Sequence, residues 1–314
     1  MRKEKLESGF GNNKFFICGL RVVVSALSFA LGFLLFSCGR KANVADKPVI
    51  TVSIAPYKYF VEKIAGDDFT VNIMVPAGAN PHIYEPFPEQ ILGLRKSEAY
   101  ISNGFMGFEM TWLDRFLEVN NSMKLLALSN NIDPIEPHDH HDHHHGEEAE
   151  IADPHYWVSP DCAKIMAQNL KEFLIALKPE RREFYETNCA KLDSIIDNID
   201  NEARQLFENC ARRAFMIYHP NLGYLARYYN LEEISVEYEG KEPSPARLRY
   251  LINRARAENL KVIFVQKEYD VRNARTIANE IGAEVVIIDP LSEDWENATR
   301  EIIELVYKSL TGNM

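Results

Sequence analysis

Residues 181–209 read RREFYETNCAKLDSIIDNIDNEARQLFEN, and this stretch decides the fold. Its apolar side chains recur in steps of three and four, which predicts one face of a continuous α-helix of about 30 residues, roughly 45 Å long. The residues of this face are Tyr185, Cys189, Leu192, Ile195 or Ile196, Ile199, Ala203 and Leu206. We interpret the face as core packing, and we expect the rigid helix to limit movement of the segments on either side.

Short runs rich in Val and Ile alternate with helical segments on both sides of this helix. Strands are predicted before the helix at residues 48–54, 70–75, 99–102 and 123–128, and after it at 214–218, 233–236, 261–266 and 284–288. These runs are apolar on both faces, as expected when helices cover both sides of a parallel sheet. We therefore predict the α/β class, with two Rossmann-like lobes that each contain a four-stranded parallel sheet and are joined by one long rigid helix. The expected boundaries are 48–160 for the N-terminal lobe, 161–210 for the helical linker and 211–314 for the C-terminal lobe.

The first 37 residues have the pattern of a bacterial lipoprotein signal peptide. A basic start precedes an apolar run at residues 22–36, which is too short for a comfortable membrane span. The run ends in Leu35-Phe36-Ser37-Cys38, which resembles a lipobox, so we predict lipidation at Cys38 and a polar tether over residues 38–47. The alternative is a signal anchor that is not cleaved. In both cases the protein is exported, to the periplasm or the cell surface, and is attached to a membrane.

Charge and cysteine content narrow the class of protein. The chain carries a net charge of −11, and removal of a leader with five basic and two acidic residues leaves −14. This balance argues against nucleic acid as a partner and suits a protein that concentrates cations. Cys189 and Cys210 would lie on the order of 30 Å apart along the long helix, too far for a disulfide. We expect these two and Cys162 to be single thiols, and we expect a monomer.

Six of the nine histidines crowd into residues 136–148, EPHDHHDHHHGEE. They are His138, His140, His141, His143, His144 and His145. The segment has almost no apolar side chains to bury, so we expect a mobile loop. Imidazoles and carboxylates at this density bind borderline metals weakly and in many arrangements, which predicts an accessory metal-binding loop.

The other three histidines are isolated, and each follows a strand or enters the helical block. His82 follows the second predicted strand, His155 precedes the linker, and His219 follows the first strand of the second lobe. Asp289 follows the last strand. Because open α/β sheets bind ligands outside the carboxyl ends of their strands, we expect these four side chains to meet in the cleft between the lobes. Three imidazoles and one carboxylate suit tetrahedral Zn²⁺, although Cu²⁺ or Ni²⁺ could also bind such a site.

These motifs, in this order, resemble the metal-binding receptors of bacterial zinc and manganese ABC importers, and in particular the zinc subgroup. The resemblance rests on GANPHIYEP around His82, DPHYW around His155, Asp289-Pro290-Leu291 and the loop at residues 239–244, EGKEPS. It implies two α/β lobes joined by a long helix, with metal between them at His82, His155, His219 and Asp289. It also implies an importer permease as partner. The histidine-rich loop is shorter than usual, Pro220-Asn221 replaces the usual pair after His219, and Gln266 stands where an acidic residue is common.

Three other functions are considered beside zinc capture and delivery. A manganese or iron receptor of the same importer class would favour a carboxylate in place of His219. A zinc hydrolase would need an open metal position and a nearby general base, and the chain contains no His-Glu-x-x-His motif. An adhesin or a periplasmic metal buffer would bind zinc without an importer. We predict a receptor that is not an enzyme, in which metal binding partly closes the lobes before delivery.

Overall fold

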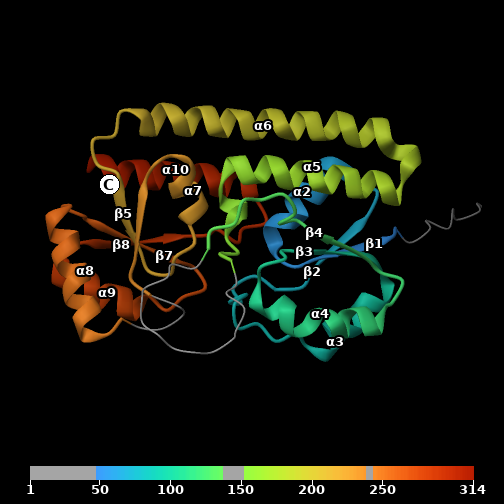
Figure 1. The fold of residues 1–314 in the computed structure, drawn as a ribbon, viewed down its shortest axis with the longest axis horizontal. Coiled ribbons are helices and arrows are strands. Elements are labelled where there is room, and N and C mark those ends of the chain that lie inside the picture. Colours follow the sequence, from blue (N-terminus) through green and yellow to red (C-terminus); the bar gives the residue numbers. More distant parts are fainter. Residues whose placement is uncertain (1–46, 137–151, 238–242) are drawn as a thin grey trace, which may run out of the picture. The chain divides into compact units, whose positions relative to one another are not determined.

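A computed structural model of the 314-residue chain describes residues 47–136, 152–237 and 243–314 (Figure 1). The predicted signal peptide, the lipidation site Cys38 and nearly all of the tether lie outside these ranges, as do the six loop histidines and residues 238–242. Within the described ranges, no helix is both long and apolar enough to cross a membrane.

The first sheet has the strand order β2-β1-β3-β4, and its neighbouring strands are parallel. Its strands are β1 (Val49–Val52), β2 (Thr70–Ile73), β3 (Ser97–Ser102) and β4 (Lys124–Ala127). The helices between them are α2 (Ala55–Ala65), α3 (Pro88–Gly93) and α4 (Gly107–Val119). Helix α3 is short, because a 3-10 turn at Leu94–Lys96 follows it and leads straight into β3. We call these strands and helices the first lobe.

The second sheet repeats this topology, with the parallel strand order β6-β5-β7-β8. Its strands are β5 (Ala214–Ile217), β6 (Glu232–Ser235), β7 (Val262–Gln266) and β8 (Glu284–Ile288). The helices that follow its first three strands are α7 (Gly223–Tyr228), α8 (Pro245–Ala257) and α9 (Val271–Ile281). We call these strands and helices the second lobe.

Two long helices lead from the first lobe to the second along the chain, and a third long helix follows the second lobe. They are α5 (Pro160–Leu177), α6 (Arg182–Glu208) and α10 (Trp295–Thr311). The longest, α6, packs against α5, against α2 of the first lobe and against α10. It runs along one side of both lobes in Figure 1. The predicted α/β architecture, two four-stranded parallel sheets with a long helix, is confirmed.

One hydrophobic core extends through both lobes. In β5, Phe215 and Ile217 belong to the cluster that also contains Ile50 of β1 and the buried Trp295 of α10. The alternate residue Met216 points to the other face of the sheet and joins a second cluster under α8 and α9. The two-residue alternation of strand side chains therefore buries both faces of the second sheet, as its apolar runs predict.

The three cysteines of the described chain are free thiols. Cys162 and Cys189 are buried and Cys210 is partly buried. Burial raises the pKa of the Cys162 and Cys189 thiols, so both remain protonated at neutral pH. Among the described residues the three thiols are unpaired, as predicted, and the two buried ones pack in the core.

Candidate metal centre

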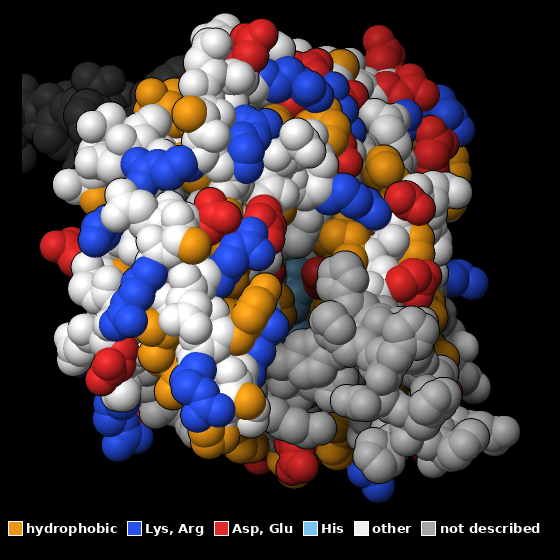
Figure 2. Space-filling model, turned by 60° about the vertical axis from the view of Figure 1, so that its left-hand side comes forward, with side chains coloured by type: hydrophobic (Ala, Val, Ile, Leu, Met, Phe, Trp, Pro, Cys, Tyr) orange, Lys and Arg blue, Asp and Glu red, His pale blue; other side chains and the backbone are white. Residues whose placement is uncertain are grey.

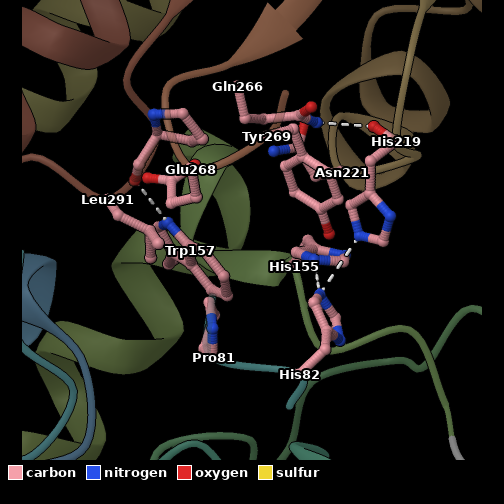
Figure 3. Close-up of a pocket in the computed structure, with 11 residues that line it drawn as sticks. Pro81, His82, His155, Trp157, His219, Asn221, Gln266, Glu268, Tyr269 and Leu291 are labelled. Atoms are coloured by element: carbon pink, nitrogen blue, oxygen red, sulfur yellow. Dashed lines mark hydrogen bonds between the residues drawn. The ribbon is translucent and has the colours of Figure 1, made fainter. Parts of the chain in front are cut away.

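Three histidines from distant parts of the chain converge at one point between the lobes (Figure 3). His82 lies in the loop after β2, His155 lies directly before a 3-10 turn at Tyr156–Val158, and His219 lies two residues after β5. The Nε2 atom of His82 is 2.9 Å from Nε2 of His155 and 3.1 Å from Nε2 of His219. Three ring nitrogens at this separation can all reach one small cation.

Two of the rings are each oriented by a carboxylate, which is hydrogen-bonded to the ring nitrogen that faces away from the other histidines. Nδ1 of His155 donates to Oδ1 of Asp153 at 2.7 Å, and Nδ1 of His219 donates to Oε2 of Glu237 at 2.8 Å. An ionised carboxylate can only accept a hydrogen bond, so the proton of each neutral ring lies on Nδ1 and the Nε2 lone pair faces the other histidines. This is the arrangement that carboxylates behind metal-binding histidines produce.

Burial keeps the site in its metal-binding protonation state. Desolvation, followed by the neighbouring His155 and His219, lowers the pKa of His82 to about 2. Desolvation also lowers the pKa of His219, against the opposing effect of Glu237. Burial alone would raise the pKa of Asp153, but its contacts with His155 outweigh this and lower it. Two imidazoles are therefore neutral, and the carboxylate behind His155 is ionised, well below neutral pH.

The histidines lie at the bottom of a narrow hollow. His155 and His219 are only 5% and 8% exposed, whereas His82 is partly exposed at the entrance. In Figure 2 a pale-blue histidine surface is just visible in the hollow. The lining also includes Trp157, Glu268 and Tyr269. The limited access would exclude most water from a bound ion.

Asp289 lies beyond the end of β8, as predicted, but it does not join the three histidines. Its Oδ2 accepts from Nζ of Lys267 at 3.2 Å, and its side chain is 37% exposed. The carboxylate among the residues that line the hollow is instead Glu268, whose pKa is raised by burial and by nearby Asp289. The sequence does not predict Glu268 as part of the site, because its position in the turn after β7 carries no motif.

The second lobe holds His219 from several sides. Gln266, the last residue of β7, donates from Nε2 to the backbone oxygen of His219 at 2.5 Å. An amide can donate this bond and an ionised carboxylate cannot, so glutamine at this position has a role that an ionised acidic residue could not fill. The ring of Tyr269 stacks on His219, with 4.8 Å between centroids and 19° between planes.

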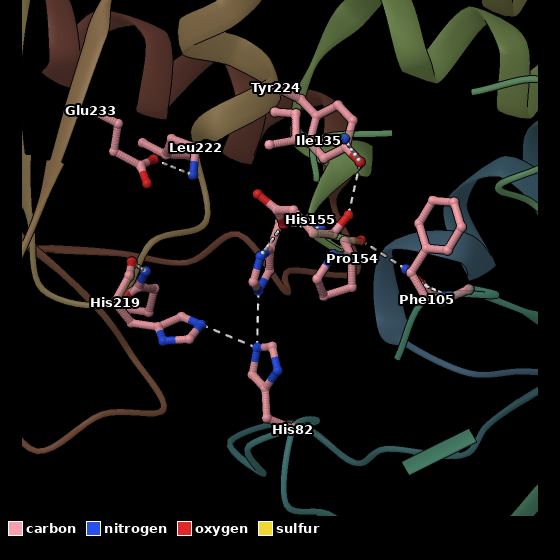
Figure 4. Close-up of polar contacts among 12 residues, drawn as sticks. His82, Phe105, Ile135, Pro154, His155, His219, Leu222, Tyr224 and Glu233 are labelled. Atoms are coloured by element: carbon pink, nitrogen blue, oxygen red, sulfur yellow. Dashed lines mark hydrogen bonds and ion pairs between the residues drawn. The ribbon is translucent and has the colours of Figure 1, made fainter. Parts of the chain in front are cut away.

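The turn after His219 and the segment before His155 are also fixed by polar contacts (Figure 4). Glu233 Oε2 accepts from the backbone N–H of Leu222 at 2.6 Å, and burial, with a contribution from Asp153, raises the pKa of Glu233 to about 8. The hydroxyl of Tyr224 donates to the backbone oxygen of Asp153 at 2.8 Å. These contacts place His155 and His219 on rigid supports, which lowers the entropy lost when a ligand fixes them.

The donor set determines which ions suit the site. In a tetrahedral zinc shell with Zn–N distances near 2.0–2.1 Å, two nitrogens lie about 3.3 Å apart. The observed separations of 2.9 and 3.1 Å are within a few tenths of an ångström of this value. Neutral imidazoles suit Zn²⁺, Cu²⁺ and Ni²⁺, whereas Mg²⁺ and Ca²⁺ prefer oxygen ligands.

Comparison with known proteins agrees with the fold and with a metal site. The family model described as zinc-uptake complex component A, periplasmic, matches residues 50–310. The chain is 26% identical to the high-affinity zinc uptake system protein ZnuA of Bacillus subtilis over 82% of this chain and 85% of that protein. It is also 26% identical to the manganese ABC transporter substrate-binding lipoprotein PsaA of Streptococcus pneumoniae, over 87% and 91%. A crystal structure of ZnuA is similar with a TM-score of 0.78 and 37% identity, over 84% of this chain and 99% of that one.

Proposed function

This chain belongs to the family of periplasmic A components of zinc-uptake complexes, and from that premise we propose that it captures Zn²⁺ outside the cytoplasmic membrane and delivers it to an ABC importer permease. Membership confirms the resemblance predicted from the motifs, to metal-binding receptors of ABC importers. This family consists of transporter receptors and not of enzymes, so the hydrolase alternative is dropped.

The observation that carries the proposal is the convergence of three Nε2 atoms, from His82, His155 and His219. Three neutral nitrogen ligands favour zinc over manganese, because Mn²⁺ prefers an oxygen-rich shell. The carboxylates of Asp153 and Glu237 support this choice, since they make the rings more basic without occupying the shell.

We propose Asp289 as the fourth ligand, as the resemblance implies. Its contact with Lys267 is an ion pair between partly exposed groups, and such pairs are weak in water. A divalent cation beside three histidines would compete well with a lysine ammonium for the carboxylate. A modest movement of the turn after β8 would then complete an N₃O shell.

The parts of the chain outside the described residues have roles in the same proposal. Residues 1–37 would direct export, Cys38 would carry the lipid, and residues 38–47 would tether the lobes at 48–160 and 211–314, with the linker 161–210 between them. The six loop histidines would raise the local zinc concentration or sense it. Deletion of residues 138–145 should therefore leave the affinity of the purified protein nearly unchanged, and a large loss of affinity would show that these histidines form the principal site.

Manganese is the second candidate ion, because a manganese receptor is among the relatives. The two ions are distinguished by metal analysis of the purified protein and by competition titration with Zn²⁺ and Mn²⁺. We expect one tightly bound Zn²⁺ per chain, loss of this ion in His219→Ala, and a shift toward Mn²⁺ in His219→Glu. Preferential binding of Mn²⁺ by the unmodified protein would refute the zinc assignment.

Delivery to an importer is tested in the cell. Deletion of the gene should reduce zinc uptake and growth in zinc-poor medium, and added zinc should restore growth. Normal uptake and growth of the deletion strain would favour a metal buffer or an adhesin instead.

A further inference from the structure

Lys267 and Asp289 lie side by side just beyond the carboxyl ends of β7 and β8. Gln266 and Ile288, the last residues of these parallel strands, are partners in the register, so Lys267 and Asp289 are the next residues of each segment. The backbone N–H of Lys267 donates to the backbone oxygen of Ile288 at 3.0 Å, and Nζ of Lys267 donates to Oδ2 of Asp289 at 3.2 Å. The register of the sheet therefore holds this lysine against this aspartate.

The carboxylate of Asp289 lies outside the hollow that contains the three histidines. Its neighbour Pro290 lines this hollow, but neither Asp289 nor Lys267 does. The backbone oxygen of Pro290 accepts from the buried ring N–H of Trp157 at 2.8 Å, which fixes the turn directly after Asp289. With this anchor on one side and the end of β8 on the other, movement of the carboxylate toward the histidines is confined to Asp289 and the peptide groups beside it.

The Asp289 carboxylate cannot hold the ammonium group of Lys267 and an ion in the hollow at the same time. To follow Asp289 into the hollow, the ammonium would have to leave water and approach a divalent cation, and both steps are unfavourable. The side chain of Lys267 is 62% exposed, so its ammonium can instead swing out into water. Binding of an ion through Asp289 therefore breaks the ion pair, and the stability of that pair opposes binding.

We propose that Lys267 competes with the metal ion for the carboxylate of Asp289 and thereby sets the affinity of the site below the value that the ligands alone would give. This inference rests on the proposed function of Asp289 as the fourth ligand. Because both partners of the pair are partly exposed, the lysine weakens zinc binding by about two- to fivefold. A receptor must give up its ion to the permease, and a group that takes the carboxylate as the ion leaves favours that step.

The test is a competition titration of the purified full-length protein against a chromophoric zinc chelator. Lys267→Met removes the charge and keeps a long unbranched side chain, so we expect zinc to bind about two- to fivefold more tightly. Lys267→Arg keeps the charge and should not bind zinc more tightly than the unmodified protein. Lys261→Met is the matched control, because Lys261 is an exposed lysine at the other end of β7, and its affinity should be unchanged. An unchanged or weaker affinity in Lys267→Met would overturn the inference.

A double-mutant cycle shows whether Lys267 acts through Asp289. In an Asp289→Asn protein, Lys267→Met should lose most of its effect on zinc affinity. In the protein with Asp289 intact, the difference between Lys267→Met and Lys267 should become smaller from low to high salt, because salt screens a pair of exposed charges. An undiminished effect in Asp289→Asn would overturn the competition for the carboxylate.

Failure of the proposed function would give a different result. If Asp289 is not a ligand, Asp289→Asn alone will leave the zinc affinity unchanged, and if the protein does not capture zinc, the unmodified chain will not compete with the chelator. If only the inference about Lys267 is wrong, Asp289→Asn will weaken zinc binding while Lys267→Met and Lys261→Met will have equal affinities.

Discussion

A carboxylate behind His219 orients the ring of this histidine. Glu237 is 8% exposed and lies two residues after β6, at the same sheet edge as His219. Asp153 has the equivalent role for His155. The positions of both acids can be recognised in the sequence, since Asp153 lies in the DPHYW motif and Glu237 lies just past a strand end. Neither acid is a predicted ligand. Such residues are not found from a ligand pattern alone, because they act on the metal only by orienting the histidine that binds it.

Glu237→Gln should weaken zinc binding about ten- to hundredfold, although the affinity should remain measurable. The amide has no charge to make the His219 ring more basic, and it can present N–H groups that favour the wrong tautomer. A competition titration against a chromophoric chelator measures the change. Glu232→Gln is the control, because Glu232 lies on β6, the strand that leads to Glu237, but pairs with Arg254 at the surface. Equal affinities for the two variants would contradict the orienting role.

The lowered pKa values of His82 and His219 predict how stability depends on pH. In the unfolded chain both rings take up protons near pH 6.5, but in the folded protein they do so only at lower pH. Their contribution to stability is therefore complete above about pH 6.5 and is lost as the pH falls toward the folded-state pKa values.

Thermal unfolding of the metal-free protein at pH 7.5 and pH 5 tests whether stability decreases as the pH falls. We expect a lower Tm at pH 5, and a smaller decrease in His82→Asn, which lacks one of the titrating groups. As the pH falls, the zinc affinity should also decrease less steeply than it would if protons competed with zinc for three histidines of unshifted pKa. The same decrease in Tm for both proteins would exclude His82 as a source of the pH dependence.

The amino-acid sequence predicts where three histidines lie because His155 and His219 are next to element ends and His82 lies in the GANPHIYEP motif. It does not predict Tyr269 or the Lys267 contact of Asp289, since stacking and ion pairing depend on where side chains from separate turns meet. The three histidines therefore converge as expected, while their role as ligands and the position of Asp289 in the metal-bound protein stay predictions.

At the scale of elements, the sequence pattern leaves the phase of α6 open between two neighbouring isoleucines. The structure buries Ile196 completely and leaves Ile195 partly exposed, and further along it buries Phe207 in preference to Leu206. A repeat of three and four residues shows that a helix has a buried face. Where two apolar residues are adjacent, the repeat does not show which of them lies on that face. The packing of α6 against α2, α5 and α10 determines which of these residues are buried.

Ile196→Ala should lower the free energy of unfolding by about 2–5 kcal/mol, because it leaves a cavity in the core shared by both lobes. Ile195→Ala is an internal control of the same chemistry on the same helix, and it should cost about 1 kcal/mol. Urea unfolding followed by circular dichroism measures both. If the two substitutions cost the same, the helix would have a different buried face.

For the whole molecule, the two sheets and the long helix are predictable from the sequence pattern, but the side-chain contacts that join the lobes are not. The ring N–H of Trp295 donates to the backbone oxygen of Trp157 at 2.7 Å, and that of Trp157 donates to the backbone oxygen of Pro290 at 2.8 Å. Lys58 of α2 pairs with Glu293 at 2.7 Å. These contacts join residues more than 130 positions apart, so no local pattern announces them.

Such a connection limits how far zinc binding can close the protein. With one core running through both lobes and α6 packed along them, the metal can move the loops at the site but can hardly rotate one lobe against the other. Small-angle X-ray scattering of the metal-free and zinc-loaded protein should therefore give radii of gyration that agree to within about 1 Å. Trp295→Ala, which removes a buried side chain of the shared core, should loosen the lobes and enlarge the difference. A decrease of several ångströms on zinc binding in the unmodified protein would show that the lobes swing as rigid bodies.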